Sequence, residues 1–201
     1  MKEFFNKFSL VFADRILRRR IFFTLFALAL FRVLASIPVP GVDRGRLAQF
    51  FTSNEFFGLL NIFSGGGLSQ LSIVMLGVGP YITASIIMQL ATVLSPRLKE
   101  MHQEEGDAGR RKFVQYGRLI SLPLAVMQGY ALLTLLVRKD VLPAMTHVEM
   151  TSNLVIITAG TMLMMWLGEQ INEKGIGNGV SLIIFAGIVA ALPQTLGQYF
   201  L

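Results

Sequence analysis

The chain has 201 residues, of which 53% are hydrophobic and only 15% are charged. A soluble domain normally carries about 25% charged residues, so the composition argues against one. The absence of cysteine excludes disulfides and thiolate metal sites, and the net charge of +6 leaves open whether the basic residues serve topology or nucleic acid.

The apolar residues gather into five runs, and the hydrocarbon core of a membrane takes about 17–25 residues of helix to cross. The runs predict an all-α polytopic membrane protein, because helices satisfy their backbone groups internally where water is absent. The fourth run is the shortest. We expect residues 1–20 to form an N-terminal segment and 21–201 a membrane domain, with spans at 21–37, 71–94, 119–137, 153–169 and 180–201.

The N-terminal segment, 1–20, places Phe4, Phe8 and Ile16 at helical spacing, with lysines and arginines elsewhere around the helix. This pattern predicts an amphipathic helix in the cytoplasmic interface. The first span begins about twenty residues into the chain and contains Arg32, and neither feature suits a cleavable signal peptide.

A short, semi-apolar stretch, LNIFSGGGLSQLS at 60–72, lies directly before the second span. It is too short to cross a bilayer, and three consecutive glycines interrupt it. The second span then carries Gly77, Gly79 and Pro80, which predict a kink or local unwinding near its start. Pro123 and Pro193 are further kink candidates.

The basic residues follow a topological pattern. They precede the first span and fill the segments after spans two and four, whereas the alternate loops hold only Arg44, Arg46, Arg138 and Lys139. This bias places the N-terminus in the cytoplasm and associates the positive charge with topology and anionic lipid rather than nucleic acid. We expect 95–118 to be a mobile hydrophilic hairpin and Asn178 to cap the fifth span.

Candidate catalytic groups are few. His102 and His147 fall on opposite sides of the predicted membrane and cannot share a metal site, and the acidic residues 104, 105 and 107 have the character of solvated loop charge. The pattern GIGNG at 175–179 follows no strand and lacks the lysine of a phosphate-binding loop. We therefore expect no catalytic residue, metal or cofactor.

The spans also lack the ionisable residues that an ion-coupled transporter uses. Arg32 lies near the outer end of span one, Glu169 lies at the cytoplasmic end of span four, and Gln89 and Gln128 are the polar intramembrane candidates for bonds between helices.

Two pairs of isoleucines share helical faces, Ile82 with Ile86 and Ile184 with Ile188. A ring of such side chains forms a hydrophobic constriction that gates by excluding water. Lipid contact or helix packing accounts for the same spacing, and periodicity alone favours that simpler interpretation.

Several motifs together resemble the N-terminal half of the SecY family of protein-translocation channel subunits. They occur in order along almost the whole chain as IPVPGV, NIFSGGGLSQLSI, GPYITASIIMQL, GRRKFVQYGR and WLGEQINEKGIGNGVSLIIFAGIVAALP. The resemblance implies one five-span repeat of an inverted-repeat channel in the cell membrane, with ten spans in the complete protein.

The same resemblance implies roles for particular positions. The stretch about 59–70 would fold back as a short re-entrant plug helix, and spans two and three would form one side of a lateral gate that includes Ile87 and Gln128. The pore ring would take Ile82, Ile86, Ile184 and Ile188. The plug would comprise Asn61, Ile62, Phe63, Ser64, Gly65, Gly66, Gly67 and Leu68.

The resemblance implies protein partners and no enzymatic activity. These partners would be SecE and SecG-like subunits, the SecA motor or a ribosome at the cytoplasmic face, signal sequences, nascent polypeptides and membrane lipids. A second repeat is absent from the 201 residues, so we expect no conduction of polypeptide by this chain alone. A transporter repeat and a scaffold or insertase without an aqueous pore remain alternatives.

Overall fold

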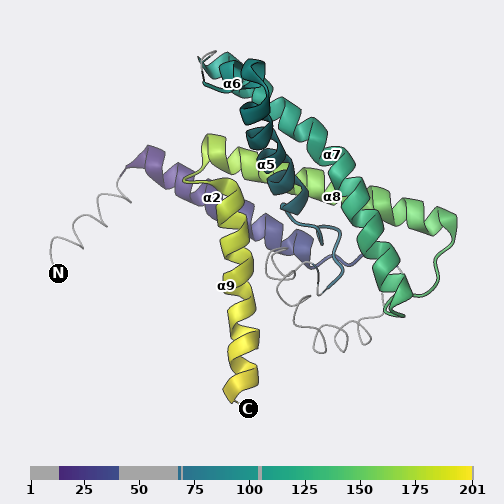
Figure 1. The fold of residues 1–201 in the computed structure, drawn as a ribbon. Coiled ribbons are helices and arrows are strands. Elements are labelled where there is room, and N and C mark those ends of the chain that lie inside the picture. The colour runs from purple at the N-terminus through teal and green to yellow at the C-terminus, as the bar shows by residue number, and fades with distance from the viewer. Residues whose placement is uncertain (1–13, 41–67, 69, 104–105, 201) are drawn as a thin grey trace.

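The computed structural model describes residues 14–40, 68, 70–103 and 106–200, without the side chains of 107 and 191–200. Within these ranges the protein is all-helical, as predicted, and its single β-bridge joins Pro38 to Ser72. Figure 1 shows the helices, which are α2 (Arg15–Ala35), α5 (Gly79–Leu94), α6 (Pro96–Gln103), α7 (Gly106–Arg138), α8 (His147–Lys174) and α9 (Gly179–Phe200).

Helix α8 is the centre of the packing. It contacts α7, α9 and α2, while α5 packs against α7 and α6 (Figure 1). Its buried side chains include Ile157, Met164 and Ile171, which recur every seven residues and so lie along one face of the helix. The fourth apolar run is the shortest in the sequence, yet it forms the helix that α2, α7 and α9 all contact.

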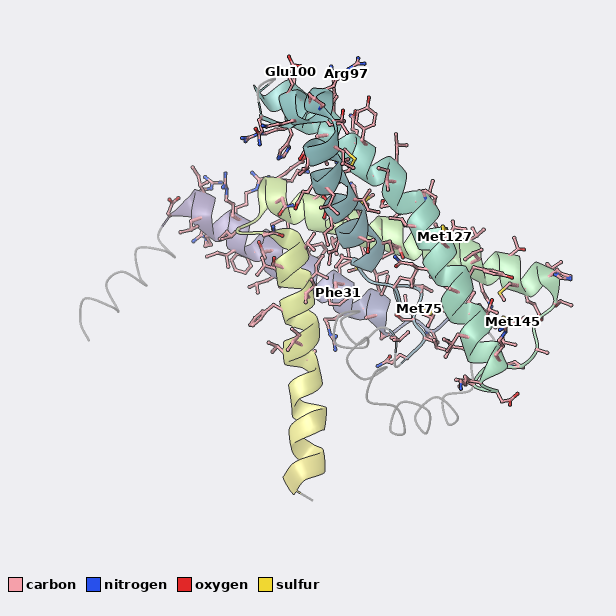
Figure 2. All side chains as sticks on the ribbon, in the orientation of Figure 1. Phe31, Met75, Arg97, Glu100, Met127 and Met145 are labelled. Carbon is pink, nitrogen blue, oxygen red and sulfur yellow. The ribbon has the colours of Figure 1, made fainter. Side chains whose placement is uncertain are left out.

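Two apolar clusters hold the helices together, and the segment 68–78 contributes to both. Leu71 and Met75 pack with Leu136 and Ile157 in the first cluster. The second cluster contains Val74, Val78, Phe31, Met164, Leu167 and Ile183. Figure 2 shows Phe31 and Met75 within the packed part of the molecule, whereas Arg97 and Glu100 lie at its far end on α6.

The segment 71–78 forms successive turns rather than helix, and α5 begins at Gly79, eight residues after the predicted start of the second span. The turns are closed by short-range bonds, such as those from Met75 N–H to the Ser72 carbonyl and from Gly77 N–H to the Val74 carbonyl. Gly77 adopts a φ of 56°, which favours glycine. The unwinding predicted near this glycine is therefore present, and it covers the whole first third of the span.

The hydrophilic hairpin predicted at 95–118 consists of helices rather than an open loop. It contains α6 and the first turns of α7, which pack against one another. The ring centroids of His102 and Phe113 are 4.4 Å apart, and this contact helps to join the two helices. Several charged residues of this stretch are exposed on these helices, namely Arg97, Lys99, Glu100, Arg110, Arg111 and Lys112. Further along α7, Pro123 does not interrupt the helix.

Among the described residues, two helices are long and apolar enough to cross a membrane, Ala108–Arg138 and His147–Lys174. Helix α5, Gly79–Leu94, is apolar but shorter, and of α9 only the apolar part Gly179–Ala190 lies within the residues whose side chains are described. Helix α2 begins within the segment predicted to lie in the interface and includes the arginines at 15, 18, 19, 20 and 32. These charges lower its hydropathy, so the five predicted spans are not all evident from helix length and composition.

The turn between α8 and α9 is fixed by side-chain hydrogen bonds. Asn178 Oδ1 accepts from Ser181 N–H at 3.2 Å, which confirms the predicted cap of the fifth span. Ile176 N–H donates to Thr24 Oγ1 at 3.1 Å, so the turn is also attached to α2. The start of α9 is thus held in place against both neighbouring helices.

Candidate functional site

The four isoleucines of the predicted constriction lie on α5 and α9. Ile82 and Ile184 are half-buried and pack against the same apolar cluster. One turn further along each helix, Ile86 and Ile188 are 50% and 38% exposed. Each pair therefore has one member attached to the core and one member presented at the surface.

The two residues predicted for the lateral gate differ in exposure. Ile87, beside Ile86 on α5, is 40% exposed, whereas Gln128 on α7 is half-buried. Neither the Gln128 nor the Gln89 side chain hydrogen-bonds to another residue in the described part of the chain. The predicted bonds between helices through these glutamines are not present there.

Of the predicted plug, Asn61, Ile62, Phe63, Ser64 and the glycines 65–67 lie outside the described residues. Leu68 is described, and its side chain is buried in the first apolar cluster. The plug helix itself is therefore not tested by the structure, and only its last predicted residue can be located.

Residues 71–78, which follow Leu68 in the chain, are non-helical and largely buried. Their backbone is paired with the end of α2, because Val39 N–H donates to the Leu71 carbonyl at 2.8 Å and Ile73 N–H donates to the Ile37 carbonyl at 3.0 Å. Non-helical backbone at membrane depth is tolerated only where protein or water covers it. Here protein covers it, since Leu71, Val74 and Met75 are all within the core.

Gly160 on α8 allows this segment to approach closely. A Cβ built on Gly160 would lie 2.0 Å from the Ile73 carbonyl oxygen and 2.8 Å from its carbon. No side chain can be accommodated at that distance from a backbone group. The position of the segment thus depends on a glycine nearly ninety residues later in the sequence.

An ion pair joins α7 to α8 at the end of the molecule where α8 terminates. Arg118 Nε donates to Glu169 Oε1 at 2.7 Å, and the two side chains are 42% and 10% exposed. The sequence placed Glu169 at this end of the fourth span but gave it no partner. In the structure its carboxylate is buried against α7 and needs the guanidinium beside it.

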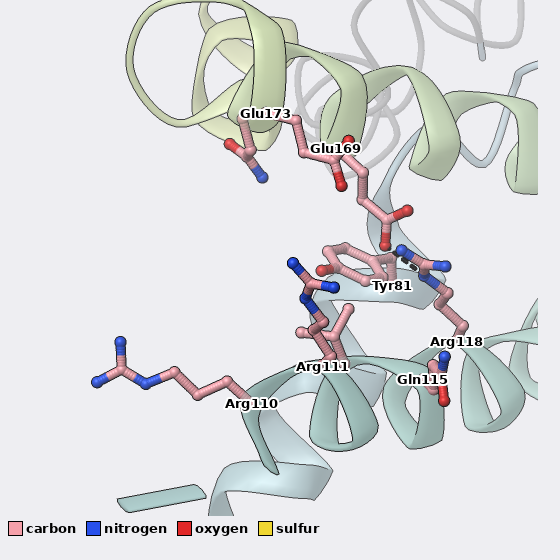
Figure 3. A pocket seen from close by; sticks show the side chains of 9 residues that line it. Tyr81, Arg110, Arg111, Gln115, Arg118, Glu169 and Glu173 are labelled. Atoms are coloured by element: carbon pink, nitrogen blue, oxygen red, sulfur yellow. Dashed lines mark hydrogen bonds and ion pairs between the residues drawn. The ribbon is translucent and has the colours of Figure 1, made fainter. Parts of the chain in front are cut away.

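The ion pair forms one wall of a pocket of about 630 Å³. The pocket takes residues from three helices, and Figure 3 shows Tyr81 of α5 beside the pair, with Arg111 on the opposite side. The sequence indicates Glu169 at this end of the span but gives no sign that Arg118 is its partner. The two residues are separated by 51 positions, and no local pattern connects them.

In the described residues, the arrangement as a whole defines an all-helical protein with two membrane-length helices and a buried non-helical segment. Comparison with known proteins identifies its family. Residues 72–201 match the family model described as SecY. The protein translocase subunit SecY of Synechocystis sp. is 48% identical over 185 residues, which cover 90% of this chain and 41% of that protein.

Other relatives agree. The protein translocase subunit SecY of Borreliella burgdorferi is 44% identical over 206 residues, which cover 100% of this chain and 46% of that protein. The chain belongs to the SecY family. It spans less than half the length of these curated relatives.

Solved structures show the same fold. One of them, "The structure of a protein conducting channel", superposes with a TM-score of 0.61 at 20% identity, over 87% of this chain and 37% of that one. Another, "Sec61 in the Canine ribosome-channel complex from the endoplasmic reticulum", gives a TM-score of 0.61 at 21% identity, with the same coverage of both chains.

Proposed function

We propose that the chain supplies one half of a protein-conducting channel, which passes unfolded secretory polypeptides across the membrane and releases membrane helices through a lateral gate. Membership of the SecY family supports this role. The observation that carries it is the placement of the isoleucines, because Ile82 and Ile184 share one cluster while Ile86 and Ile188 remain exposed.

The channel half has five spans in this proposal, although only two of the described helices are long and apolar enough to cross by themselves. Helix α5 has 16 residues and would extend about 24 Å, which is less than a hydrocarbon core of about 30 Å. The buried turns at 71–78 complete its crossing. Helix α2 would cross with its basic end in the cytoplasm, in the plasma or inner membrane.

The isoleucine ring would seal the pore around a moving chain by contact and exclusion of water, without binding that chain tightly. The stretch 59–70 would close the pore from the outside as a plug. Ile87 and Gln128 would line one side of the lateral gate, where signal sequences reach lipid. The chain would catalyse no reaction itself and would need no cofactor.

The remaining walls of the pore would come from a second repeat, since the chain covers 41% of the Synechocystis relative. The proposed partners are SecE and SecG-like subunits within the membrane. A ribosome or the SecA motor would deliver substrate at the cytoplasmic face. The ribosome is supported by the canine Sec61 chain, which shares the fold and belongs to a ribosome-channel complex.

Cysteine crosslinking tests the proposal, because the sequence contains no native cysteine. Ile86→Cys and Ile188→Cys are each introduced, with Met127→Cys on the exposed face of α7 as the matched control. The chain is co-expressed with the C-terminal part of the Synechocystis relative. A secretory polypeptide that carries one cysteine is then stalled during export.

Crosslinks from the two isoleucine positions, with none from Met127, are the expected result. Equal crosslinking at all three positions would place the polypeptide outside the proposed pore. Failure at both isoleucine positions, while the stalled polypeptide is bound to the complex, would refute the proposed pathway.

A further inference from the structure

The ion pair between Arg118 and Glu169 joins α7 to α8 about one turn from a second contact, in which the Ser121 hydroxyl meets Met165 Sδ at 3.5 Å. Residues of both α7 and α8 also line the 630 Å³ pocket beside the pair. The 2.7 Å contact bridges one side of that space. Because the Glu169 side chain is only 10% exposed, its charge depends strongly on the partner.

The pair also lies beside the start of α5. Tyr81 lines the same pocket, and Figure 3 shows its ring next to the two bonded side chains. Tyr81 immediately precedes Ile82, which packs against the second apolar cluster. A movement of α7 relative to α8 at the ion pair would therefore change the support under the first turn of α5.

Two other arginines line the same pocket without forming the ion pair that Arg118 forms. Arg110 and Arg111 line the same pocket on the same helix, and neither forms an ion pair with a described residue. In Figure 3, Arg110 points away from the pair. Arg110 therefore offers a matched control of the same residue type.

We propose that Arg118 and Glu169 are positioning residues, which hold the first turn of α5 and so keep Ile82 and Ile86 in their closed arrangement. The inference rests on the proposed channel function and adds a site of control to it. Loss of Arg118 leaves the buried Glu169 carboxylate unpaired, so the helices relax toward an arrangement in which it meets water, and loss of Glu169 removes the contact that joins α7 to α8. The closed arrangement loses stability as a result.

Distances between spin labels test whether the ion pair positions α5. Leu90 on α5 and Val155 on α8 are both exposed, so cysteines at these two positions can carry the labels. Pulsed electron–electron double resonance then gives the distribution of distances between the labels in liposomes. Glu169→Gln and Arg118→Gln are expected to shift or broaden this distribution, whereas Arg110→Gln leaves it unchanged. If both Glu169→Gln and Arg118→Gln keep the parent distance distribution, the inference is overturned.

Charge exchange separates positioning from general loss of structure. The double variant Arg118→Glu with Glu169→Arg restores the pair in the reverse direction, so the parent distribution should return. If that protein does not fold, Arg118→Lys keeps a cation near Glu169 and should retain the parent distribution. A folded exchange variant, or the lysine variant, that behaves as Glu169→Gln does would contradict a role for the pair.

Ion leakage tests the functional part in the channel completed with the C-terminal part of the Synechocystis relative. In liposomes, Arg118→Gln is expected to raise chloride leakage about tenfold, because it leaves the buried Glu169 carboxylate without its cation. Arg110→Gln should match the parent. Normal translocation with unchanged leakage would overturn the positioning role alone, whereas a completed channel that neither leaks nor translocates would refute the proposed function itself.

Discussion

Replacing Gly160 with alanine should destabilise the protein, although alanine is the better helix former. The new Cβ would lie 2.0 Å from the Ile73 carbonyl oxygen, and that neighbour is backbone and cannot rotate away. Overpacking of this kind costs about 1–3 kcal/mol. Since the 2.0 Å contact must open considerably to reach an ordinary van der Waals separation, the upper end of that range applies.

The gain in helix propensity offsets part of this cost. Alanine is favoured over glycine in a helix interior by about 1 kcal/mol, which leaves a net loss of about 2 kcal/mol for Gly160→Ala. Gly117→Ala is the matched control, because a Cβ at Gly117 in α7 would meet nothing within 4 Å. That variant should be neutral or more stable by up to about 1 kcal/mol.

Unfolding by sodium dodecyl sulfate in mixed micelles, followed by circular dichroism, measures both variants against the parent. The midpoint for Gly160→Ala should fall, and that for Gly117→Ala should stay or rise. An unchanged midpoint for Gly160→Ala would mean that α8 does not contact the Ile73 carbonyl closely, and that the position of residues 71–78 does not depend on Gly160.

Three further substitutions address other contacts by the same unfolding measurement. Thr24→Val removes the acceptor for Ile176 N–H and should cost about 1 kcal/mol, and an unchanged midpoint would show that water replaces the bond. Asn178→Ala removes the cap that receives Ser181 N–H and should cost about 0.5–2 kcal/mol, whereas a stable variant would argue against that cap. Ser72→Ala should cost nothing, because the buried Ser72 hydroxyl has no hydrogen-bond partner among the described residues; a clear loss would reveal a partner.

Local sequence patterns predict where the helices are better than they predict how the helices pack. The apolar runs locate α7, α8 and α9, and Asn178 can be identified as a cap because capping depends on residues three positions apart. Glycine and proline at 77–80 indicate a break in the second span. The break extends back to residue 71 because the bonds that hold it come from the end of α2, which no local pattern contains.

The contacts that define the candidate site depend on residues far apart in sequence. Glu169 can be placed at a helix end from its neighbours in the chain, but only the fold shows that α7 covers it. The charged stretch 95–118 suggests a loop, since hydrophilic composition does not distinguish an exposed helix face from a loop. Gly160 gives no signal in the sequence, because the importance of a glycine at a crossing depends on what crosses it.

The buried turns at 71–78 have a consequence for the order of synthesis. Their backbone lacks the regular bonds of a helix and cannot lie exposed to lipid, and the surface that covers it includes α8, which ends at Lys174. About one hundred residues must therefore be added after the turns emerge, which takes roughly 5–20 seconds of translation. In the proposed five-span arrangement, the second crossing has no finished binding surface during that interval, so early assembly would require either shelter by another protein or delayed insertion of residues 71–94 into the bilayer.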